Sequence, residues 1–191
     1  MDPRAARTQA RLQDALLELA RERPLDEIAV GDITERAGVS RSSFYQHYSD
    51  KDTLLADALE RVIDDVSGRL RTRGAAMPVG MPEELQHYLA HLAANAALYR
   101  RVLGEHGSSV VTARLRRHVE RIVSETIDAT NTPAFTGVPL DVVAAGIAGT
   151  ALGVITAWIS RDPLPPLEEA ADWLWRVLTG PGVLAAAEGE A

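Results

Sequence analysis

Residues 30–55 read VGDITERAGVSRSSFYQHYSDKDTLL, and this stretch decides the fold. Ile33 and Ala37 lie four residues apart, as on the buried side of a short helix, and Gly38 follows as a residue able to adopt a left-handed turn. Ser40 suits the start of a second helix, because its hydroxyl can accept a hydrogen bond from a free amide of the first turn. The stretch therefore predicts two short helices joined by a tight turn.

Along most of the chain, apolar residues recur at the three- and four-residue spacing of helices with one buried side. Proline and glycine residues mark where these segments end, and strand patterns are absent. The sequence thus predicts an all-α protein of about nine helices. The predicted helices are residues 4–23, 30–37, 41–47, 51–71, 83–94, 96–103, 108–129, 139–160 and 166–179.

The chain is acidic, with a formal net charge of -7 and a pI of about 5.2. Residues 1–71 contain 11 Arg and Lys against 14 Asp and Glu, so the N-terminal part is not basic either. Any contact with nucleic acid must then come from a local cluster, because a charge at physiological salt acts over about 8 Å. The sequence has no Cys for disulfides or thiolate zinc sites, and nothing near Met1 resembles a signal peptide. We therefore expect a cytoplasmic protein.

Two helices around a turn form the helix-turn-helix, in which the second helix enters the major groove of DNA. Phe44 and Tyr48 lie four residues apart at this second helix and are expected to pack inward, which leaves its polar side chains exposed. Arg41 suits a bidentate contact with guanine and Gln46 one with adenine, whereas the serine hydroxyls suit phosphates equally well. The second helix thus offers a surface for reading DNA.

The string ITERAGVSRSSFYQHYSDKDTLL, from Ile33 to Leu55, closely resembles the signature of the tetracycline-repressor (TetR) family. The resemblance covers the first third of the chain strongly and the remainder only by the number and length of its helices. It implies a DNA-binding transcriptional regulator, most simply a repressor that a small-molecule effector releases from a palindromic operator. Activation of transcription remains an alternative.

The resemblance also implies a domain organisation, and the Pro- and Gly-containing stretch from Gly74 to Pro82 marks its boundary. An N-terminal three-helix DNA-binding domain is expected to be joined by a connecting helix to a helical domain for effector binding and dimerisation. The predicted parts are residues 1–50 for the helix-turn-helix domain, 51–73 for the connecting helix, 74–82 for the loop, 83–180 for the C-terminal domain and 181–191 for a disordered tail.

In the family, residues around the end of the second helix commonly contact the DNA backbone, which adds Tyr45, His47 and Lys51 to the candidates. Lys51 is the only Lys in the chain, and the free amides that open its helix would offer a further positive end to phosphate. The expected DNA-binding residues are Arg41, Ser42, Ser43, Tyr45, Gln46, His47 and Lys51.

Two departures from the family pattern support an alternative function. Where the family often has Thr before its second helix and Arg or Lys two residues later, this chain has Ala29 and Gly31, and both positions lose a possible DNA contact. The alternative is a small-molecule or metal-binding helical dimer with little DNA affinity. His87 and His91, with Glu84 one turn earlier, have a spacing that suits a divalent cation, but no third protein ligand is identifiable. We therefore expect no metal and no cofactor.

The segment from Val142 to Ser160 contains no charge over 19 residues, which is long enough to span a bilayer. Its many small residues and the lack of a basic flank argue against a membrane. Small residues at four-residue spacing favour a close helix contact, and the family resemblance implies dimerisation through the last two long helices. Burial within one subunit is the alternative. The expected dimer residues are Ala145, Gly149, Gly153, Leu167, Ala170, Leu174 and Leu178.

The resemblance further implies an effector pocket in the C-terminal domain, for an apolar small molecule. The same side chains are better suited to filling the core, because apolar residues at helical spacing mainly occupy interiors. No glycine-rich phosphate loop, nucleophile elbow or acid–base pair points to an enzyme. The expected pocket residues are Leu89, Leu92, Tyr99, Leu103, Val119, Ile122 and Trp158.

Overall fold

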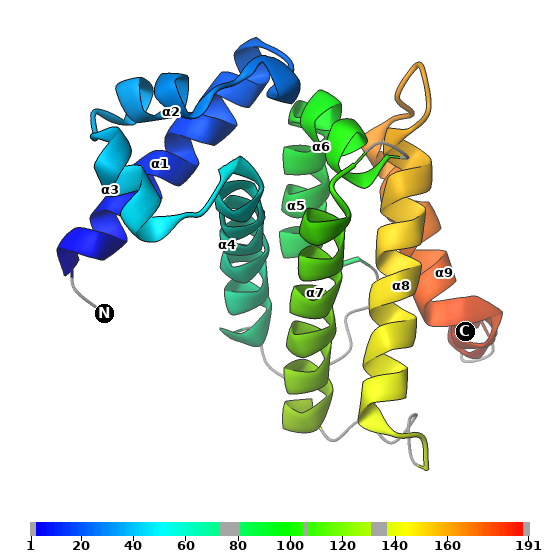
Figure 1. Cartoon of the computed structure of the whole chain (residues 1–191). Coiled ribbons are helices and arrows are strands. Elements are labelled where there is room, and N and C mark those ends of the chain that lie inside the picture. Colours follow the sequence, from blue (N-terminus) through cyan, green and yellow to red (C-terminus); the bar gives the residue numbers. More distant parts are fainter. Residues whose placement is uncertain (1–2, 73–80, 105–106, 131–136, 189–191) are drawn as a thin grey trace. The chain divides into compact units, whose positions relative to one another are not determined.

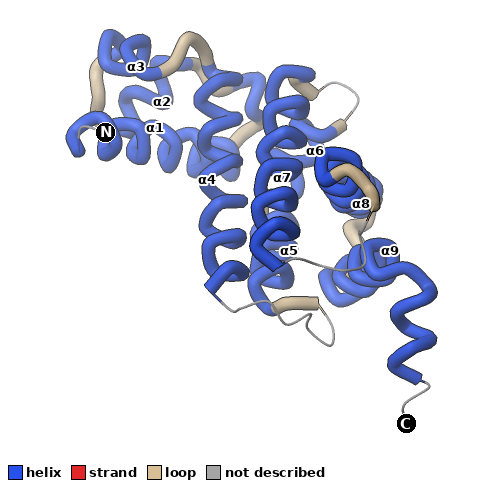
Figure 2. Tube along the Cα trace, turned by 90° about the horizontal axis from the view of Figure 1, so that it is seen from below, coloured by secondary structure: helices blue, strands red, loops and turns tan. Residues whose placement is uncertain are grey.

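The computed structural model describes residues 3–72, 81–104, 107–130 and 137–188 (Figure 1). Every regular element in these ranges is helical, as Figure 2 shows, which confirms the all-α prediction. Most of the loop expected at residues 74–82 lies outside the described residues. The elements are α1 (Pro3–Glu22), η1 (Leu25–Glu27), α2 (Val30–Ala37), α3 (Arg41–His47), α4 (Lys51–Thr72), α5 (Glu83–Ala94), α6 (Ala96–Leu103), α7 (Ser109–Thr130), α8 (Leu140–Ile159) and α9 (Leu167–Glu188).

The helices form two compact units, and these differ from a simple division at residues 74–82. The N-terminal unit comprises Met1–Asp64 and Asn95–Leu115, and the C-terminal unit comprises Asp65–Ala94 and Arg116–Ala191. Helix α6 and the first turns of α7 therefore belong to the same compact unit as the helix-turn-helix. Helices α4 and α7 each contribute to both units.

The core of the N-terminal unit forms where α1 packs against α2, α3 and α6. The helical spacing of its leucines places Leu12 and Leu16 inward, where they meet other fully buried side chains such as Ile33 of α2 and Phe44 of α3. Full burial of a side chain of this size contributes about 2 kcal/mol to stability. This core holds the short helices α2 and α3, which are too short to be stable in isolation.

The C-terminal unit is built on the packing of α9 against α8 and α5. Trp158 of α8 is 1% exposed, and its indole Nε1–H donates to the carbonyl of Pro165 at 3.0 Å. Helix α8 is long and apolar enough to cross a membrane by length and composition, but Trp158, Ile159 and Ala148 are buried within the unit. We therefore describe α8 as a partly buried helix of a soluble protein.

The last helix extends further than the sequence suggested. Gly180 adopts φ 70° and ψ 168°, so the regular helix ends where the sequence analysis placed its end. A second helical segment follows this break and reaches Glu188, where a disordered tail was expected. A glycine takes the positive φ without strain, so the break itself was predictable and the resumption of the helix was not.

Candidate nucleic-acid interface

The turn between α2 and α3 has the geometry that its sequence suggested. Gly38 lies in the left-handed region at φ 62° and ψ 42°, and its N–H donates to the carbonyl of Glu35 at 3.0 Å. The N–H of Val39 donates to the carbonyl of Thr34, also at 3.0 Å, so two of the last four carbonyls of α2 are satisfied. The turn therefore ends α2 at Ala37 and sets the direction in which the chain enters α3.

Two buried aromatic rings, Phe44 and Tyr48, hold helix α3 against the core. Phe44 is fully buried and Tyr48 is 2% exposed, and the Tyr48 hydroxyl accepts a hydrogen bond from the Gln13 side-chain amide at 3.1 Å. At the other end Ser40 caps the helix, because its Oγ accepts the N–H of Ser43 at 3.1 Å. The rings therefore anchor the helix to the core, and the exposed Ser40 cap satisfies an amide at its start.

The opposite side of α3 presents polar side chains to solvent. Tyr45 is 60% exposed, and its ring meets Phe44 edge-on at 5.2 Å between ring centres. The hydroxyls of Ser42 and Ser43 lie 2.8 and 3.0 Å from the Ser40 hydroxyl, so they share a small hydrogen-bonded cluster at the start of the helix. We call the following residues the recognition face, since all are exposed or half-exposed: Arg41, Ser42, Ser43, Tyr45, Gln46 and His47.

Arg41 lies across the beginning of α2. A Cβ atom built on Gly31 would stand 2.5 Å from Arg41 Nη2, closer than any real contact. The guanidinium therefore occupies the space that a side chain at position 31 would fill. The Arg41 guanidinium of α3 thus lies where the family often has an Arg or Lys side chain on α2. The sequence did not predict this placement.

The start of α2 is completed by an acid instead of a capping residue. Ala29 has no side chain that can cap, but its N–H donates to the Asp32 carboxylate at 2.8 Å. Arg23 pairs with the same carboxylate at 2.7 Å. A carboxylate near the positive end of a helix is stabilising, so Asp32 stabilises the start of α2 although Ala29 cannot cap it.

Lys51 has internal partners. Its ammonium donates to the carbonyls of Leu25 at 2.6 Å and Ile28 at 2.9 Å, which fastens η1 to the start of α4. Two of its three N–H donors are thus used inside the protein. Asp50 caps the same helix by accepting the N–H of Thr53 at 2.7 Å, and this bond lowers the pKa of Asp50 below its ordinary value of 3.8. We therefore leave Lys51 out of the proposed DNA contacts.

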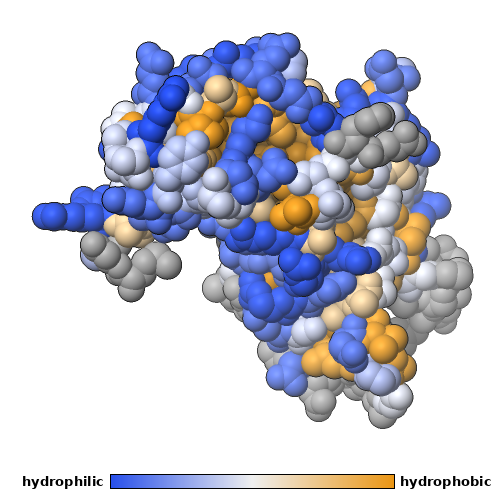
Figure 3. Space-filling view, viewed as in Figure 1, coloured by the Kyte–Doolittle hydropathy of each residue, from blue (hydrophilic) through white to orange (hydrophobic). Residues whose placement is uncertain are grey.

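Helix α1 carries a basic face that the sequence analysis missed. Arg4, Arg7 and Arg11 are all exposed, and their spacing of three and four residues places them on one side of the helix. Arg11 Nη2 donates to the carbonyl of Gly38 at 3.2 Å, which brings this face to the turn before α3. Hydrophilic side chains project from this part of the surface (Figure 3). The spacing was visible in the sequence, but the acidic total concealed it.

The residues expected to line an effector pocket are divided between the two units. Leu89, Leu92 and Trp158 are at most 1% exposed and belong to the C-terminal unit, whereas Tyr99 and Leu103 belong to the N-terminal unit. None of the expected residues lines the surface cavity of about 360 Å³ that lies in the N-terminal unit. That cavity is bounded by Leu25, Asp26, Lys51, Asp52, Leu55, Arg101, Val102, Ser108, Ser109 and Val111.

The residues expected at a dimer contact differ in exposure. Ala145, Gly149 and Gly153 are exposed on α8, and a Cβ on either glycine would meet nothing within 4 Å. Ala170 and Leu174 are 1% and 4% exposed, because α9 packs on α8 and α5 within the same chain. Both side chains therefore offer little exposed area in the single chain, and their place in a dimer contact stays a prediction. Leu167 and Leu178 are half-buried, and the sequence analysis missed the exposed side chains of Val142 and Val177.

The histidines of α5 show no metal geometry. His87 Nε2 lies 3.9 Å from Glu83 Oε1 on the exposed side of the same helix. In the part of the chain that the structure describes, no three His, Cys, Asp or Glu side chains are grouped so that they could hold a metal ion.

A turn-linked helix pair with an exposed polar face, followed by a helical region, defines the class of helix-turn-helix DNA-binding proteins. The family model "Bacterial regulatory proteins, tetR family" matches residues 12–58, and the model "Transcriptional regulator C-terminal region" matches residues 81–180. The chain belongs to the TetR family of DNA-binding transcriptional regulators, which is not a family of enzymes.

Relatives with curated names align with the N-terminal part. The "Uncharacterized HTH-type transcriptional regulator YxbF" of Bacillus subtilis is 34% identical over 71 residues, which are 37% of this chain and 19% of that protein. EthR of Mycobacterium tuberculosis is 37% identical over 54 residues, which are 28% of this chain and 25% of that protein. The alignments thus span a quarter or less of these relatives.

Solved structures resemble the chain over most of its length. A TetR-family regulator from Syntrophomonas wolfei has a TM-score of 0.66 at 17% identity, covering 91% of this chain and 96% of that one. Thermus thermophilus FadR, a repressor crystallised with lauroyl-CoA, has a TM-score of 0.62 at 21% identity, covering 90% and 93%. Bacillus subtilis FadR, crystallised with stearoyl-CoA, has a TM-score of 0.56 at 17% identity, covering 88% and 96%. These likenesses concern the fold.

Proposed function

We propose that this regulator acts in the cytoplasm as a homodimer, represses transcription by occupying a palindromic operator, and leaves the operator when a small molecule binds. The observation that carries the proposal is the recognition face on α3, whose polar side chains point to solvent while Phe44 and Tyr48 anchor the helix from beneath. A rigid helix with one bare polar side is the element that reads base edges in the major groove.

The proposed DNA contacts fall into two groups. Arg41 and Gln46 read base edges, and Tyr45, His47 and the serine hydroxyls position the helix on the backbone. Arg7 and Arg11 of α1 contact phosphates beside the same groove, because Arg11 is tied to the turn that opens α3. A local cluster of arginines allows an acidic chain of net charge -7 to bind negatively charged DNA, since each phosphate contact acts over a short range.

The proposed dimer contact uses the exposed small residues of α8. Among the described residues, no side chain and no other element lies within 4 Å of a Cβ built on Gly149 or Gly153. A second helix can therefore approach the backbone closely, and the exposed Val142 adds apolar area. Pale and orange residues lie over α8 in Figure 3. A dimer presents two recognition helices to two half-sites, so modest contacts from each gain in avidity.

For the effector we propose an acyl chain or another long apolar molecule. Two structures of similar fold carry acyl-CoA ligands, and the C-terminal unit of this chain offers mainly apolar side chains, including Leu89, Leu92 and Ile122. A hundredfold release from DNA requires about 2.8 kcal/mol of coupling, which lies within the usual range for ligand-driven switches.

The test is selection of bound fragments from random DNA, followed by titration of the selected site with and without lauroyl-CoA. We expect an inverted repeat with half-sites about one helical turn apart and release at micromolar ligand. A folded dimer that shifts no DNA even at low salt would overturn the operator proposal and favour the alternative of a small-molecule-binding dimer. Binding that no acyl-CoA weakens would overturn only the effector part.

A further inference from the structure

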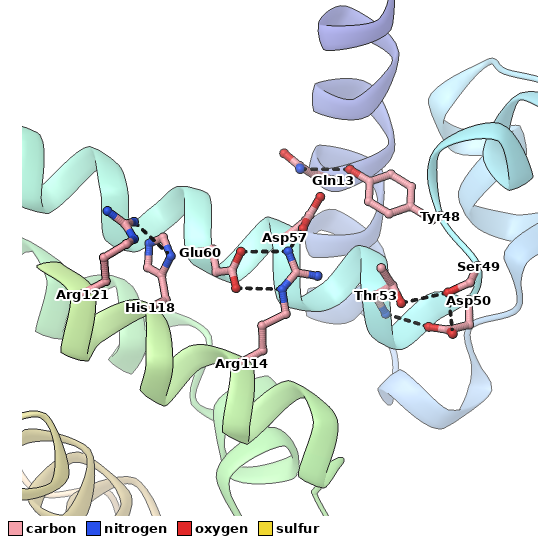
Figure 4. Close-up of polar contacts among 10 residues, drawn as sticks. All are labelled: Gln13, Tyr48, Ser49, Asp50, Thr53, Asp57, Glu60, Arg114, His118 and Arg121. Atoms are coloured by element: carbon pink, nitrogen blue, oxygen red, sulfur yellow. Dashed lines mark hydrogen bonds and ion pairs between the residues drawn. The ribbon is translucent and has the colours of Figure 1, made fainter. Parts of the chain in front are cut away.

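The buried side of α1 contains a single polar side chain. Gln13 is 8% exposed, and the other buried residues of this helix, which include Leu12 and Leu16, are apolar. A buried amide loses its hydrogen bonds with water, so it lowers stability unless the protein supplies a partner. The Gln13 amide Nε2 donates to the Tyr48 hydroxyl at 3.1 Å, across 35 residues of the chain (Figure 4). The amide therefore contributes a directed contact where a leucine would contribute only apolar area.

Tyr48, the acceptor of this bond, ends the recognition helix. Its backbone is extended at φ -136° and ψ 135°, and its N–H donates to the carbonyl of Phe44 at 2.9 Å. Its side chain is 2% exposed, and the two residues before it, Gln46 and His47, belong to the recognition face. Any rotation of α3 about its own axis would therefore move the Tyr48 hydroxyl and the recognition face together.

The two rings beneath α3 restrain it in different ways. The Phe44 ring makes apolar contacts, which act in proportion to buried area and have no preferred direction. The Tyr48 ring is inclined by 47° to it, with 5.9 Å between ring centres, and its hydroxyl takes part in a bond that weakens steeply when donor and acceptor are misaligned. Arg11 of the same helix α1 donates to the carbonyl of Gly38, in the turn before α3. Helix α1 thus holds the turn before α3 and the residue that ends it.

We propose that Gln13 is a positioning residue for DNA recognition: its bond to the Tyr48 hydroxyl sets the rotation of α3 about its axis and so the direction of the recognition face. The consequence for DNA rests on the proposed function, whereas the effect on α3 does not. Side chains that read a ligand must be held to within about 0.5 Å and about 10–20° of the productive geometry. Without the bond, the apolar contacts of Phe44 still bury the helix but leave this rotation less restrained.

The first experiment measures the stability of the full-length protein by urea denaturation. The variants are Gln13→Leu, Tyr48→Phe and the double variant, with Gln9→Leu as the matched control. Gln9 is half-buried one turn earlier on the same side of α1, and no hydrogen bond joins it to α3 in the part of the chain that the structure describes. Gln13→Leu should raise the equilibrium constant for unfolding about tenfold, because the buried Tyr48 hydroxyl loses its donor. The double variant should recover most of this loss, since both polar partners are then gone.

Hydrogen exchange measured by mass spectrometry then separates position from stability, without any DNA. Amides over residues 41–48 should exchange about tenfold faster in both single variants and in the double variant, and Gln9→Leu should match the parent. The double variant decides the question, because its overall stability recovers while α3 lacks the bond, so the middle of α1 should keep the protection of the parent. Unchanged exchange over residues 41–48 in the double variant, or faster exchange spread evenly over the N-terminal unit, would overturn the inference.

On the selected operator, the double variant should bind about tenfold more weakly than the parent while its affinity for a scrambled duplex stays the same, because orientation affects base contacts more than phosphate contacts. Gln9→Leu should bind both as the parent does. Recovery of parental operator affinity together with parental stability would show that the bond serves stability alone and would overturn the inference. If the parent binds no operator, the proposed function fails, and the exchange over residues 41–48 still decides whether Gln13 positions α3.

Discussion

Replacing Gly31 by Ala separates DNA recognition from stability, because the two should change in opposite directions. Gly31 lies in the first turn of α2 with ordinary helical geometry, so Ala adopts the same backbone. Ala is favoured over Gly in a helix by up to about 1 kcal/mol, and the free energy of unfolding should rise by about half of that near a helix end.

The new methyl group displaces Arg41. Its Cβ would stand 2.5 Å from Nη2, whereas ordinary contact begins at 3.4 Å, so the guanidinium must move by about an ångström. A bidentate contact with a base is worth about 1–3 kcal/mol and depends on the position of both nitrogens. We therefore expect a loss of about 1–2 kcal/mol, or roughly 5- to 30-fold in operator affinity.

The assay is fluorescence anisotropy with the selected operator and a scrambled duplex, beside urea denaturation of each variant. Gly68→Ala is the matched control, since Gly68 is also helical and a Cβ there meets nothing within 4 Å. It should gain similar stability without losing affinity. Parental operator affinity in Gly31→Ala, or a loss of stability, would refute the placement of Arg41.

Three further predictions concern other parts of the structure. Lys51→Met should lower the free energy of unfolding by about 1 kcal/mol, because two part-buried carbonyls lose a charged donor. The salt dependence of DNA binding should keep its slope, and a slope smaller by about one would restore Lys51 as a phosphate contact. Asp50→Ala should cost about 1 kcal/mol at neutral pH through the lost cap. Because folding lowers the pKa of Asp50, this contribution is present above the ordinary pKa of 3.8 and disappears as the pH falls through the pKa of the folded state. The free energies of unfolding of the parent and of Asp50→Ala should therefore converge in acid. A difference that stays constant with pH would contradict the cap. Gly149→Leu should leave the monomer folded but raise the dissociation constant of the dimer at least about tenfold, as measured by analytical ultracentrifugation. An unchanged dissociation constant would show that the dimer interface does not include this part of α8.

The sequence predicted the helices well because their ends are marked by local chemistry. Ser40 and Gly38 set the limits of α3 and α2, and Gly180 ended the regular part of α9, each through its own backbone or side chain. The prediction weakened where partners are distant in sequence. Apolar spacing showed that one side of α9 is buried, but not that the chain itself covers Ala170.

For the candidate site, too, the sequence predicted local features and missed contacts between distant residues. Exposure of the recognition face followed from the four-residue spacing of Phe44 and Tyr48, which local geometry determines. The carbonyl partners of Lys51 and the carboxylate partners of Arg114 come from 23 to 57 residues away, and no local pattern indicates them. Such contacts depend on how the elements pack.

The measurement that tests the account most directly is the affinity of the parent and of Arg41→Ala for every single-base variant of the selected operator. If α3 reads the groove, the parent should discriminate at symmetric positions in both half-sites, and Arg41→Ala should lose about 1–3 kcal/mol of discrimination at one base pair in each. Equal discrimination by parent and variant at every position would contradict the central claim that the exposed face of α3 recognises the operator.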